Sequence, residues 1–168
     1  MSAPTAADSS PSILGHHAAA RGVTVVATGT PDDAGRLTKL GAATIVDHTK
    51  GPVAEQVLAV DPGGVDALIE LAAQSPDASP LAAVCQGGKA VGTTMGVSEQ
   101  VLTARGLAGG TVMAQPVREV TAPLAGQAAA GALTVDVETV LPLEQAADGL
   151  AIIAAGKARG KIVVQISD

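Results

Sequence analysis

The chain contains no aromatic residue at all: its 168 residues include no Phe, Tyr or Trp. Aromatic side chains provide the largest buried anchors of most cores, and they also stack on bases and bind cations. A core in this chain therefore has to consist of many small aliphatic contacts. The hydrophobic content of 47% is sufficient for such a core, and the length predicts a single domain.

Basic charge is scarce as well. Ten Lys and Arg residues stand against sixteen Asp and Glu residues, which gives a net charge of −6, and the basic residues are scattered along the chain. A nucleic-acid-binding protein is expected to carry a basic patch and, for single strands, stacking aromatic side chains. The composition therefore excludes nucleic acid as a predicted partner.

Few side chains could bind a metal. The single cysteine, Cys85, excludes an intrachain disulfide and any multi-cysteine metal site. Its neighbours SPLAAV and QGGK favour a small buried thiol near the end of a helix. His16 and His17 are adjacent and point in different directions on a helix, and with His48 they show no spacing typical of zinc ligands. We predict no metal site, and in particular no zinc.

Long hydrophobic runs are missing too, because Gly, Pro or a charged residue interrupts every apolar stretch before about 18 residues accumulate. The first residues, MSAPTAADSSPS, lack the basic start and apolar core of a signal peptide. We predict no membrane segment, a flexible tail over residues 1–11, a folded domain over residues 12–168, and a cytoplasmic protein.

What the sequence does contain is an alternation of β-branched runs with helical segments. Strands are predicted at residues 23–28, 44–47, 65–71, 90–95, 107–113, 138–141 and 161–166. Helices are predicted between Thr30 and Gly41 and at residues 52–60, 77–85, 119–132 (after Pro123) and 142–158. This order predicts an α/β fold with a mostly parallel sheet and helices on both faces, which makes three layers.

The first of these helices carries clear signals at both ends. Thr30 suits the N-cap, Pro31 suits the first turn, and Asp32 and Asp33 suit the positive end of the helix dipole. Gly41 suits the C-terminus.

Four stretches resemble a known family: ARGVTVVATGTPDDAGRLTKLGAATIVDHTK, GGVDALIEL, GGKAVGTTMG and VLPLEQAADGLAIIAAGKARGKIVVQI. Over residues 17–166 the chain resembles the C-terminal, nucleotide-binding part of medium-chain dehydrogenases/reductases, in the branch of quinone oxidoreductases and zinc-type alcohol dehydrogenases. The resemblance implies a Rossmann-like fold that binds NAD(P)H at the carboxyl ends of its strands, and hydride transfer from NADPH to a quinone or enone. It also implies a separate N-terminal catalytic domain, which these residues do not include.

The resemblance also implies a first strand, a glycine-rich turn and most of a first helix directly before ARGVTVV. The chain has SSPSILGHHAA there instead. Those glycines allow backbone N–H groups and a helix N-terminus to approach the pyrophosphate of the cofactor. We therefore predict a Rossmann-like domain, truncated before the second strand, whose first strand and glycine-rich loop are missing or replaced. Such a domain would bind NADP or NAD weakly.

The missing strand would be central in the usual strand order 3-2-1-4-5-6, so its loss exposes two inner edges. Three outcomes are open: residues 12–18 partly fill the gap, the flanking strands pair directly, or another chain donates a strand. We predict a homodimer formed through unpaired sheet edges. A separate catalytic domain is a further possible partner.

Relatives that use NADPH bind its 2′-phosphate with two side chains. One is a basic residue early in the helix that matches residues 30–41 here, and the other is a tyrosine at the end of the strand that matches residues 44–47. The matching positions here are Asp33, which would repel a phosphate, and His48, while Arg36 lies one turn from Asp33 and could partly compensate. The candidate cofactor-binding residues are Thr28, Thr30, Arg36 and His48 on the adenosine side, with Gly92 and Thr93 on the nicotinamide side. Capping, solvation and tight turns are the alternative roles of these residues.

No catalytic residue can be identified. Ser75, Ser79 and Ser98 lie outside any G-x-S-x-G elbow, which argues against a hydrolase, and Glu70 is a single carboxylate near the end of a strand. The leading hypothesis is an oxidoreductase-like NAD(P)-binding domain that is weak or inactive by itself. The alternative is a non-catalytic scaffold or interaction domain, either a natural remnant or an engineered aromatic-free protein.

Overall fold

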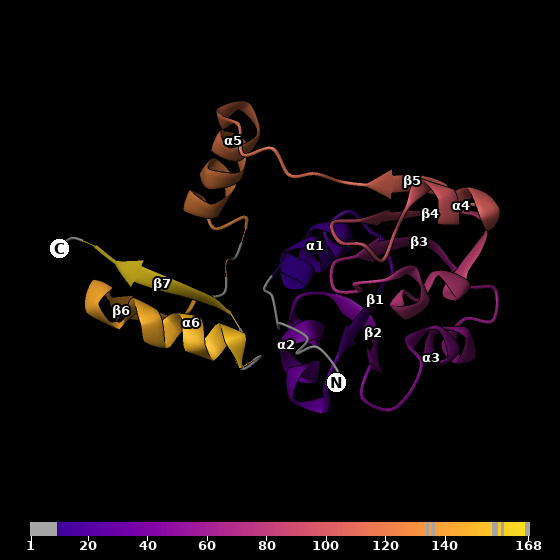
Figure 1. Cartoon of the computed structure of the whole chain (residues 1–168), viewed down its shortest axis with the longest axis horizontal. Helices are drawn as coiled ribbons and strands as arrows, with labels where there is room; N and C mark the ends of the chain where they lie inside the picture. The colour runs from indigo at the N-terminus through magenta and orange to yellow at the C-terminus, as the bar shows by residue number, and fades with distance from the viewer. Residues whose placement is uncertain (1–9, 134, 136, 156–157, 159, 167–168) are drawn as a thin grey trace. The chain divides into compact units, whose positions relative to one another are not determined.

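The structure is a computed structural model that describes residues 10–133, 135, 137–155, 158 and 160–166 (Figure 1). The predicted tail falls mostly on residues 1–9, which lie outside this part of the chain. The chain divides into two compact units, of which the larger comprises Gly15–Gln115 and the other comprises the remaining residues.

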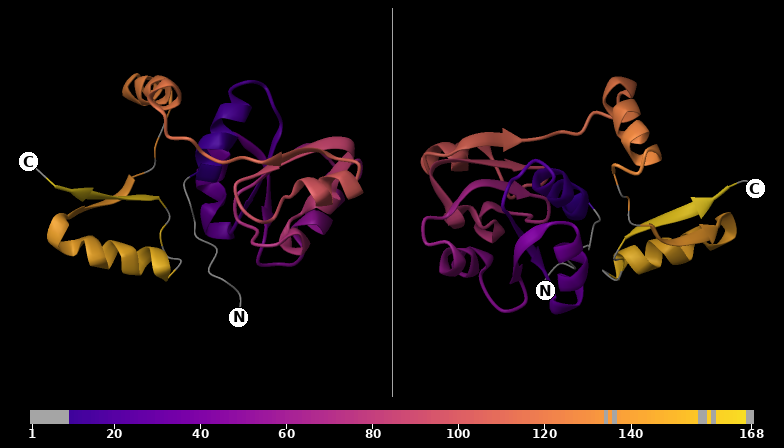
Figure 2. Two further views of the ribbon diagram at one scale, coloured as in Figure 1. Left: turned by 45° about the horizontal axis from the view of Figure 1, so that its top comes forward. Right: turned by 180° about the vertical axis from the view of Figure 1, so that it is seen from behind.

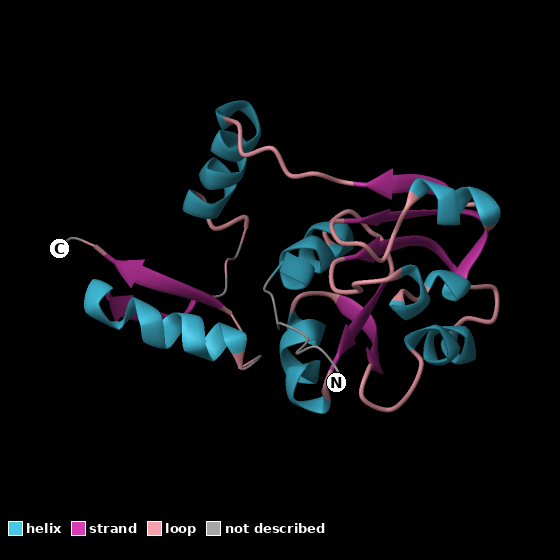
Figure 3. Cartoon of the chain, in the orientation of Figure 1, coloured by secondary structure: helices cyan, strands magenta, loops and turns pink. Residues whose placement is uncertain are grey.

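Helices and strands alternate along the chain, as Figure 3 shows by colour. The strands are β1 Val25–Gly29, β2 Ala42–Asp47, β3 Val65–Glu70, β4 Val84–Gly92, β5 Ala108–Thr111, β6 Val137–Pro142 and β7 Lys161–Gln165. The α-helices are α1 Ser10–Ala19, α2 Ala34–Lys39, α3 Val53–Val60, α4 Glu99–Ala104, α5 Arg118–Ala129 and α6 Ala146–Ala154. Short 3₁₀ turns are η1 Pro31–Asp33, η2 Pro76–Ala78, η3 Leu81–Ala83 and η4 Leu143–Gln145.

The larger unit contains two parallel sheets. β1 pairs with β2, and β3, β4 and β5 pair in that order, all in parallel. In the view of Figure 1 the strands follow one another in the order β2, β1, β3, β4, β5. This is the order of a doubly wound sheet without its central first strand. The predicted Rossmann-like α/β fold is confirmed.

Helices cover both faces of the β1–β2 sheet. Adjacent residues of a strand point to opposite faces. Val26 packs on the cluster that contains Val57 of α3, whereas Val25 lies on the side of α1, where a Cβ atom added to Gly15 would be 3.8 Å from the Val25 side chain. The helices α1 and α3 therefore lie on opposite faces of β1.

The core of this unit consists of two small aliphatic clusters. One contains Leu81, Ala90, Val97 and Leu102, each at most 2% exposed. The other contains Val46, Val57 and Ala83, with partly buried neighbours on β1 and β3. No aromatic side chain is available to fill these clusters, as the composition predicts.

No strand of the described residues takes the place of the missing first Rossmann strand between β1 and β3. Residues 12–18 belong to the helix α1, so they do not replace a strand, and β1 forms no sheet with β3. Two of the three predicted outcomes are therefore wrong. Strand donation by another chain remains a prediction.

The second unit contains a parallel pair of strands, β6 and β7, joined through the helix α6 (Figure 2). Gly149 of α6 is buried, and a Cβ atom at this position would lie 3.1 Å from the side chain of Ile162 and 3.2 Å from that of Leu141. Glycine thus allows α6 to approach both strands. Many aliphatic side chains of this unit are exposed: Val137, Val140, Leu143, Leu150, Ile153 and Val163.

The predicted helix over residues 77–85 is wrong. Two 3₁₀ turns stand there, and β4 already begins at Val84, so Cys85 lies in a strand, two residues after η3. Its thiol is half-buried and not buried as predicted. The predicted strand 90–95 accordingly starts too late and ends too late. The reason is an irregularity in the ladder: between Val65 and Ala67, the partner on β4 jumps from Val84 to Lys89. The glycines of QGGK lie in this bulge and not in a turn between elements.

Two helices also differ from the prediction. The helix α4 is absent from the prediction, although Ser98 caps it by accepting a hydrogen bond from the Val101 N–H at 3.4 Å. The helix α5 begins before Pro123 and runs through it. None of the helices in the described part of the chain is long and apolar enough to cross a membrane.

Candidate nucleotide-binding site

The candidate residues of the adenosine side gather where β1 and β2 end. The two strands are parallel and in register, with Gly29 opposite Asp47, so their carboxyl ends meet at the same edge. Thr28 lies exposed on β1, and Thr30 follows that strand; His48 lies exposed directly after β2. The structure thus brings Thr28, Thr30 and His48 to one edge of the sheet.

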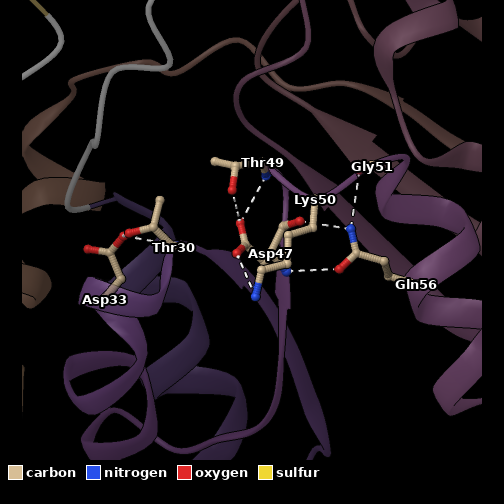
Figure 4. A network of polar contacts seen from close by, with 7 residues as sticks. All are labelled: Thr30, Asp33, Asp47, Thr49, Lys50, Gly51 and Gln56. Carbon is tan, nitrogen blue, oxygen red and sulfur yellow. Dashed lines mark hydrogen bonds and ion pairs between the residues drawn. The ribbon is translucent and has the colours of Figure 1, made fainter.

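Thr30 and Arg36 both contact Asp33 (Figure 4 shows Thr30 and Asp33). The Asp33 carboxylate accepts hydrogen bonds from the Thr30 N–H at 3.1 Å and from the Thr30 hydroxyl at 2.7 Å. The Arg36 guanidinium donates to its other oxygen at 3.4 Å. The predicted capping role of Thr30 is therefore confirmed, in the form of a capping box with Asp33.

A second polar network holds the loop after β2 (Figure 4). Asp47 Oδ1 accepts hydrogen bonds from the Thr49 N–H at 2.9 Å and from the Thr49 hydroxyl at 2.6 Å. Asp47 Oδ2 is buried and accepts no hydrogen bond, but it lies 3.4 Å from Lys50 Nζ. Since the Lys50 side chain is 70% exposed, this ion pair contributes little to stability.

Gln56 of α3 forms hydrogen bonds with both β2 and the loop that follows it. Its Oε1 accepts a hydrogen bond from the Asp47 N–H at 3.0 Å, and its Nε2 donates to the carbonyls of Asp47 at 2.8 Å and Gly51 at 3.2 Å. The loop that carries His48 is therefore fixed at both ends by one amide side chain.

Both carboxylates at this edge have lowered pKa values. For Asp33, burial acts to raise the pKa, but the hydrogen bonds from Thr30 and the hydrogen bond and charge of Arg36 outweigh it. For Asp47, the hydrogen bonds from Thr49 are the main cause of the lowered pKa, and Lys50 adds to it. Both groups are ionised at neutral pH.

The nicotinamide-side candidates lie at the carboxyl ends of β3 and β4. Glu70, only 7% exposed, ends β3, and its carboxylate accepts hydrogen bonds from the N–H groups of Ala72 at 2.8 Å and Ala73 at 2.9 Å. Ser79 donates its hydroxyl to the same carboxylate at 3.3 Å. Thr93 is exposed, and its N–H donates to the Glu70 carbonyl at 3.1 Å. Glu70 thus organises the loop that follows its strand.

Gly92 is a glycine because of packing. It is buried, and a Cβ atom there would lie 3.0 Å from the Val97 side chain and 3.3 Å from the Glu70 carbonyl oxygen. These contacts explain the absence of a side chain without a ligand, so the role of Gly92 in cofactor binding stays a prediction.

The contacts of Asp47, Thr49 and Gln56 were not predicted from the sequence. The Asp-x-Thr spacing is a signal for the first pair, since Asp side chains often bond the backbone two residues on. Gln56 carries no such signal. In the part of the chain that the structure describes, no three His, Cys, Asp or Glu residues are grouped so that they could hold a metal ion.

The sequence and the fold of the chain are similar to those of known dehydrogenases and quinone oxidoreductases. The family model of zinc-binding dehydrogenases matches residues 40–164. No curated protein matches the chain in sequence. Among solved structures, the quinone oxidoreductase of Coxiella burnetii is 19% identical with a TM-score of 0.82, over 96% of this chain and 51% of that one.

Two further quinone oxidoreductases are similar. That of Pseudomonas syringae is 22% identical, and that of Escherichia coli, in complex with NADPH, is 20% identical; each has a TM-score of 0.76 over 96% of this chain and 55% of the other. The chain thus spans about half the length of these structures. The predicted resemblance to medium-chain dehydrogenases/reductases is confirmed, and because the family model covers most of the sequence, the chain belongs to the zinc-binding dehydrogenase family.

Proposed function

We propose that the chain is the nucleotide-binding part of an NAD(P)H-dependent oxidoreductase. The observation that carries this proposal is the gathering of polar side chains where parallel strands end, in a member of a dehydrogenase family. Open α/β sheets bind their ligands beyond the carboxyl ends of the strands. The activity of the assembled protein would be hydride transfer to a quinone or a related acceptor, as the names of the similar structures suggest.

The exposed hydroxyl of Thr28 and the ring of His48 would contact the ribose of the adenosine half. Thr30 and Arg36 act there through Asp33, to which both are bonded. Thr93 and the backbone at Gly92 would face the nicotinamide half. When bound, the nicotinamide itself supplies the hydride; these residues only hold and orient it.

We expect this binding to be weak. The sequence has no glycine before Gly15, so these 168 residues contain no glycine-rich turn for the pyrophosphate ahead of β1. The family name implies zinc, but the described residues do not provide a ligand set, and no step of the proposed function passes through a metal. A separate catalytic domain would have to complete the active site.

A second candidate is a non-catalytic interaction domain. The observation in its favour is that, among the described residues, β1 and β3 each have a paired strand on one side only, and unpaired strand edges readily pair with other chains. A homodimer formed through such edges is compatible with either function.

Calorimetric titration of about 100 μM protein with NADH and with NADPH tests the proposal. We expect a dissociation constant in the high micromolar to millimolar range, equivalent to about −4 to −5 kcal/mol. Thr28→Val and His48→Ala should weaken binding. Thr103→Val on α4, outside the site, is the control for Thr28→Val. Absence of heat with both nucleotides would reject the proposal and favour the interaction domain.

A further inference from the structure

The inner strands of the larger unit are less buried than β4. In the order β2, β1, β3, β4, β5, the strands β1 and β3 stand in the interior of the row (Figure 1). Each nevertheless buries only its last residue, Gly29 and Glu70, whereas β4 buries Gly88, Ala90 and Gly92. Parallel strands are normally buried on both faces, so β1 and β3 have the exposure of edge strands.

Both strands also have a free backbone edge. Among the described residues, β1 forms a ladder with β2 alone, and β3 forms a ladder with β4 alone. In this part of the chain, the N–H and C=O groups on the other edge of each strand therefore have no partner in a ladder. Groups of this kind readily bind an additional strand.

The two strands share one aliphatic cluster. Val26 of β1 and Val65 of β3 both pack against the cluster of Val46, Val57 and Ala83. A segment between β1 and β3 would lie against this cluster and would meet backbone donors and acceptors on both sides. An extended segment can use both edges, whereas a helix bonds its own backbone groups and can use neither.

The charge on these strands is acidic. β1 contains no charged residue, and β3 contains Asp66 and Glu70. The Glu70 carboxylate is buried and already accepts hydrogen bonds from the loop that follows β3. Asp66 is exposed near the amino end of β3, and its carboxylate accepts a long hydrogen bond, at 3.9 Å, from the Cys85 thiol. A thiol is a weak donor, so the charge of Asp66 remains available to a cation.

We propose that the chain binds an extended segment of another protein between β1 and β3. The segment consists of about five uncharged, mainly β-branched residues that follow a lysine or arginine, and it runs parallel to β3. This direction places the basic residue, at the amino end of the segment, beside Asp66. The binding does not require a nucleotide, so its test is independent of the titration with NADH and NADPH.

Fluorescence anisotropy of the labelled peptide GKVVVTVG, titrated with the full chain, measures this binding. We expect saturation and an affinity at least about tenfold higher than for GKVPVPVG, because proline cannot donate to a ladder. Hydrogen exchange followed by NMR should slow for amides of both β1 and β3 in the complex. Equal affinity for the two peptides, or protection that is absent from either strand, would overturn the proposal.

Variants of Asp66 test the charge pairing. The wild type should bind GKVVVTVG about threefold more tightly than GEVVVTVG, and Asp66→Lys should reverse this preference. Asp66→Asn keeps the shape of the side chain and should abolish the preference, which decides the matter if Asp66→Lys does not fold. Asp77→Lys changes an exposed residue of η2 and, as the matched control, should keep the preference of the wild type. An unchanged preference in both Asp66 variants would overturn the proposal.

A second copy of the chain is the competing occupant of the same edges. If light scattering gives a dimer that the peptide converts to monomers at saturation, the two compete for one place, as we expect from free edges on β1 and β3. A dimer that persists while the peptide fails to bind would show that the edges serve self-association, and this result would overturn the proposal.

Discussion

At the scale of single residues, Gln56 is the side chain on which the loop after β2 depends. Its amide makes three hydrogen bonds to backbone groups of Asp47 and Gly51. Gln56→Ala removes the partners of these groups, of which the two on Asp47 are partly buried, so we expect the free energy of unfolding to fall by about 1–3 kcal/mol in urea titration. Gln100→Ala, an exposed glutamine on α4, is the matched control and should change it by less than about 0.5 kcal/mol. Equal losses in both variants would contradict the role of Gln56.

Two carboxylates make stability depend on pH. The pKa values of Asp33 and Asp47 are lowered from the ordinary 3.8 in the folded protein. A group with a lowered folded pKa stabilises the fold above its unfolded pKa, and this contribution is lost as the pH falls through the folded value.

We therefore expect Asp33→Asn and Asp47→Asn to be less stable than the wild type at pH 6, with differences that shrink as the pH falls below about 4. Urea unfolding at a series of pH values measures this. The exposed Asp77→Asn is the control. A difference that stayed constant between pH 6 and pH 2.5 would show that loss of shape, and not of charge, causes the effect.

At the scale of elements, β5 depends on one glycine. Gly109 has a φ of +127°, and a Cβ atom there would collide with the Ala90 carbonyl of β4. The neighbouring Gly110 has nothing within 4 Å of an added Cβ. We expect Gly109→Ala to lower the free energy of unfolding by about 2 kcal/mol or more, and Gly110→Ala by less than about 1 kcal/mol. Similar unfolding midpoints for the two variants would contradict this account of β5.

The errors of element prediction have a common cause. The segment 84–88 reads as the end of a helix and a glycine turn, yet it pairs with β3 through a bulge. Whether QGGK turns or bulges depends on whether a partner strand lies beside it, and the local sequence does not contain that information. Where the signal is local, as for the N-cap at Thr30, the prediction is confirmed.

At the scale of the whole molecule, the open strand edges predict self-association. Ile69 is the last residue but one of β3 and is 49% exposed, although strands of parallel sheets are normally buried on both faces. We expect light scattering at micromolar concentration to give twice the chain mass of 16.3 kDa. Ile69→Lys should shift the protein toward monomer, because lysine on a strand edge opposes strand addition.

Val60→Lys is the control for this prediction, since Val60 is 56% exposed but belongs to the end of α3. A monomeric wild type would contradict the prediction. A dimer that Ile69→Lys leaves intact would place the contact away from β3.

The sequence by itself determined the parallel α/β order, because that order follows from local runs of β-branched residues and from helix signals. It also determined the family, because a few segments have the amino-acid sequence typical of it. It also determined that the residues after β1 and β2 lie at one edge of the sheet, because the carboxyl ends of neighbouring parallel strands meet there. Only the tertiary structure decided that residues 12–18 form a helix, that β1 and β3 do not pair with each other, and that Gln56 fixes the loop of His48. These features depend on which groups meet across the fold, and such contacts follow from the packing of whole elements and not from neighbouring residues.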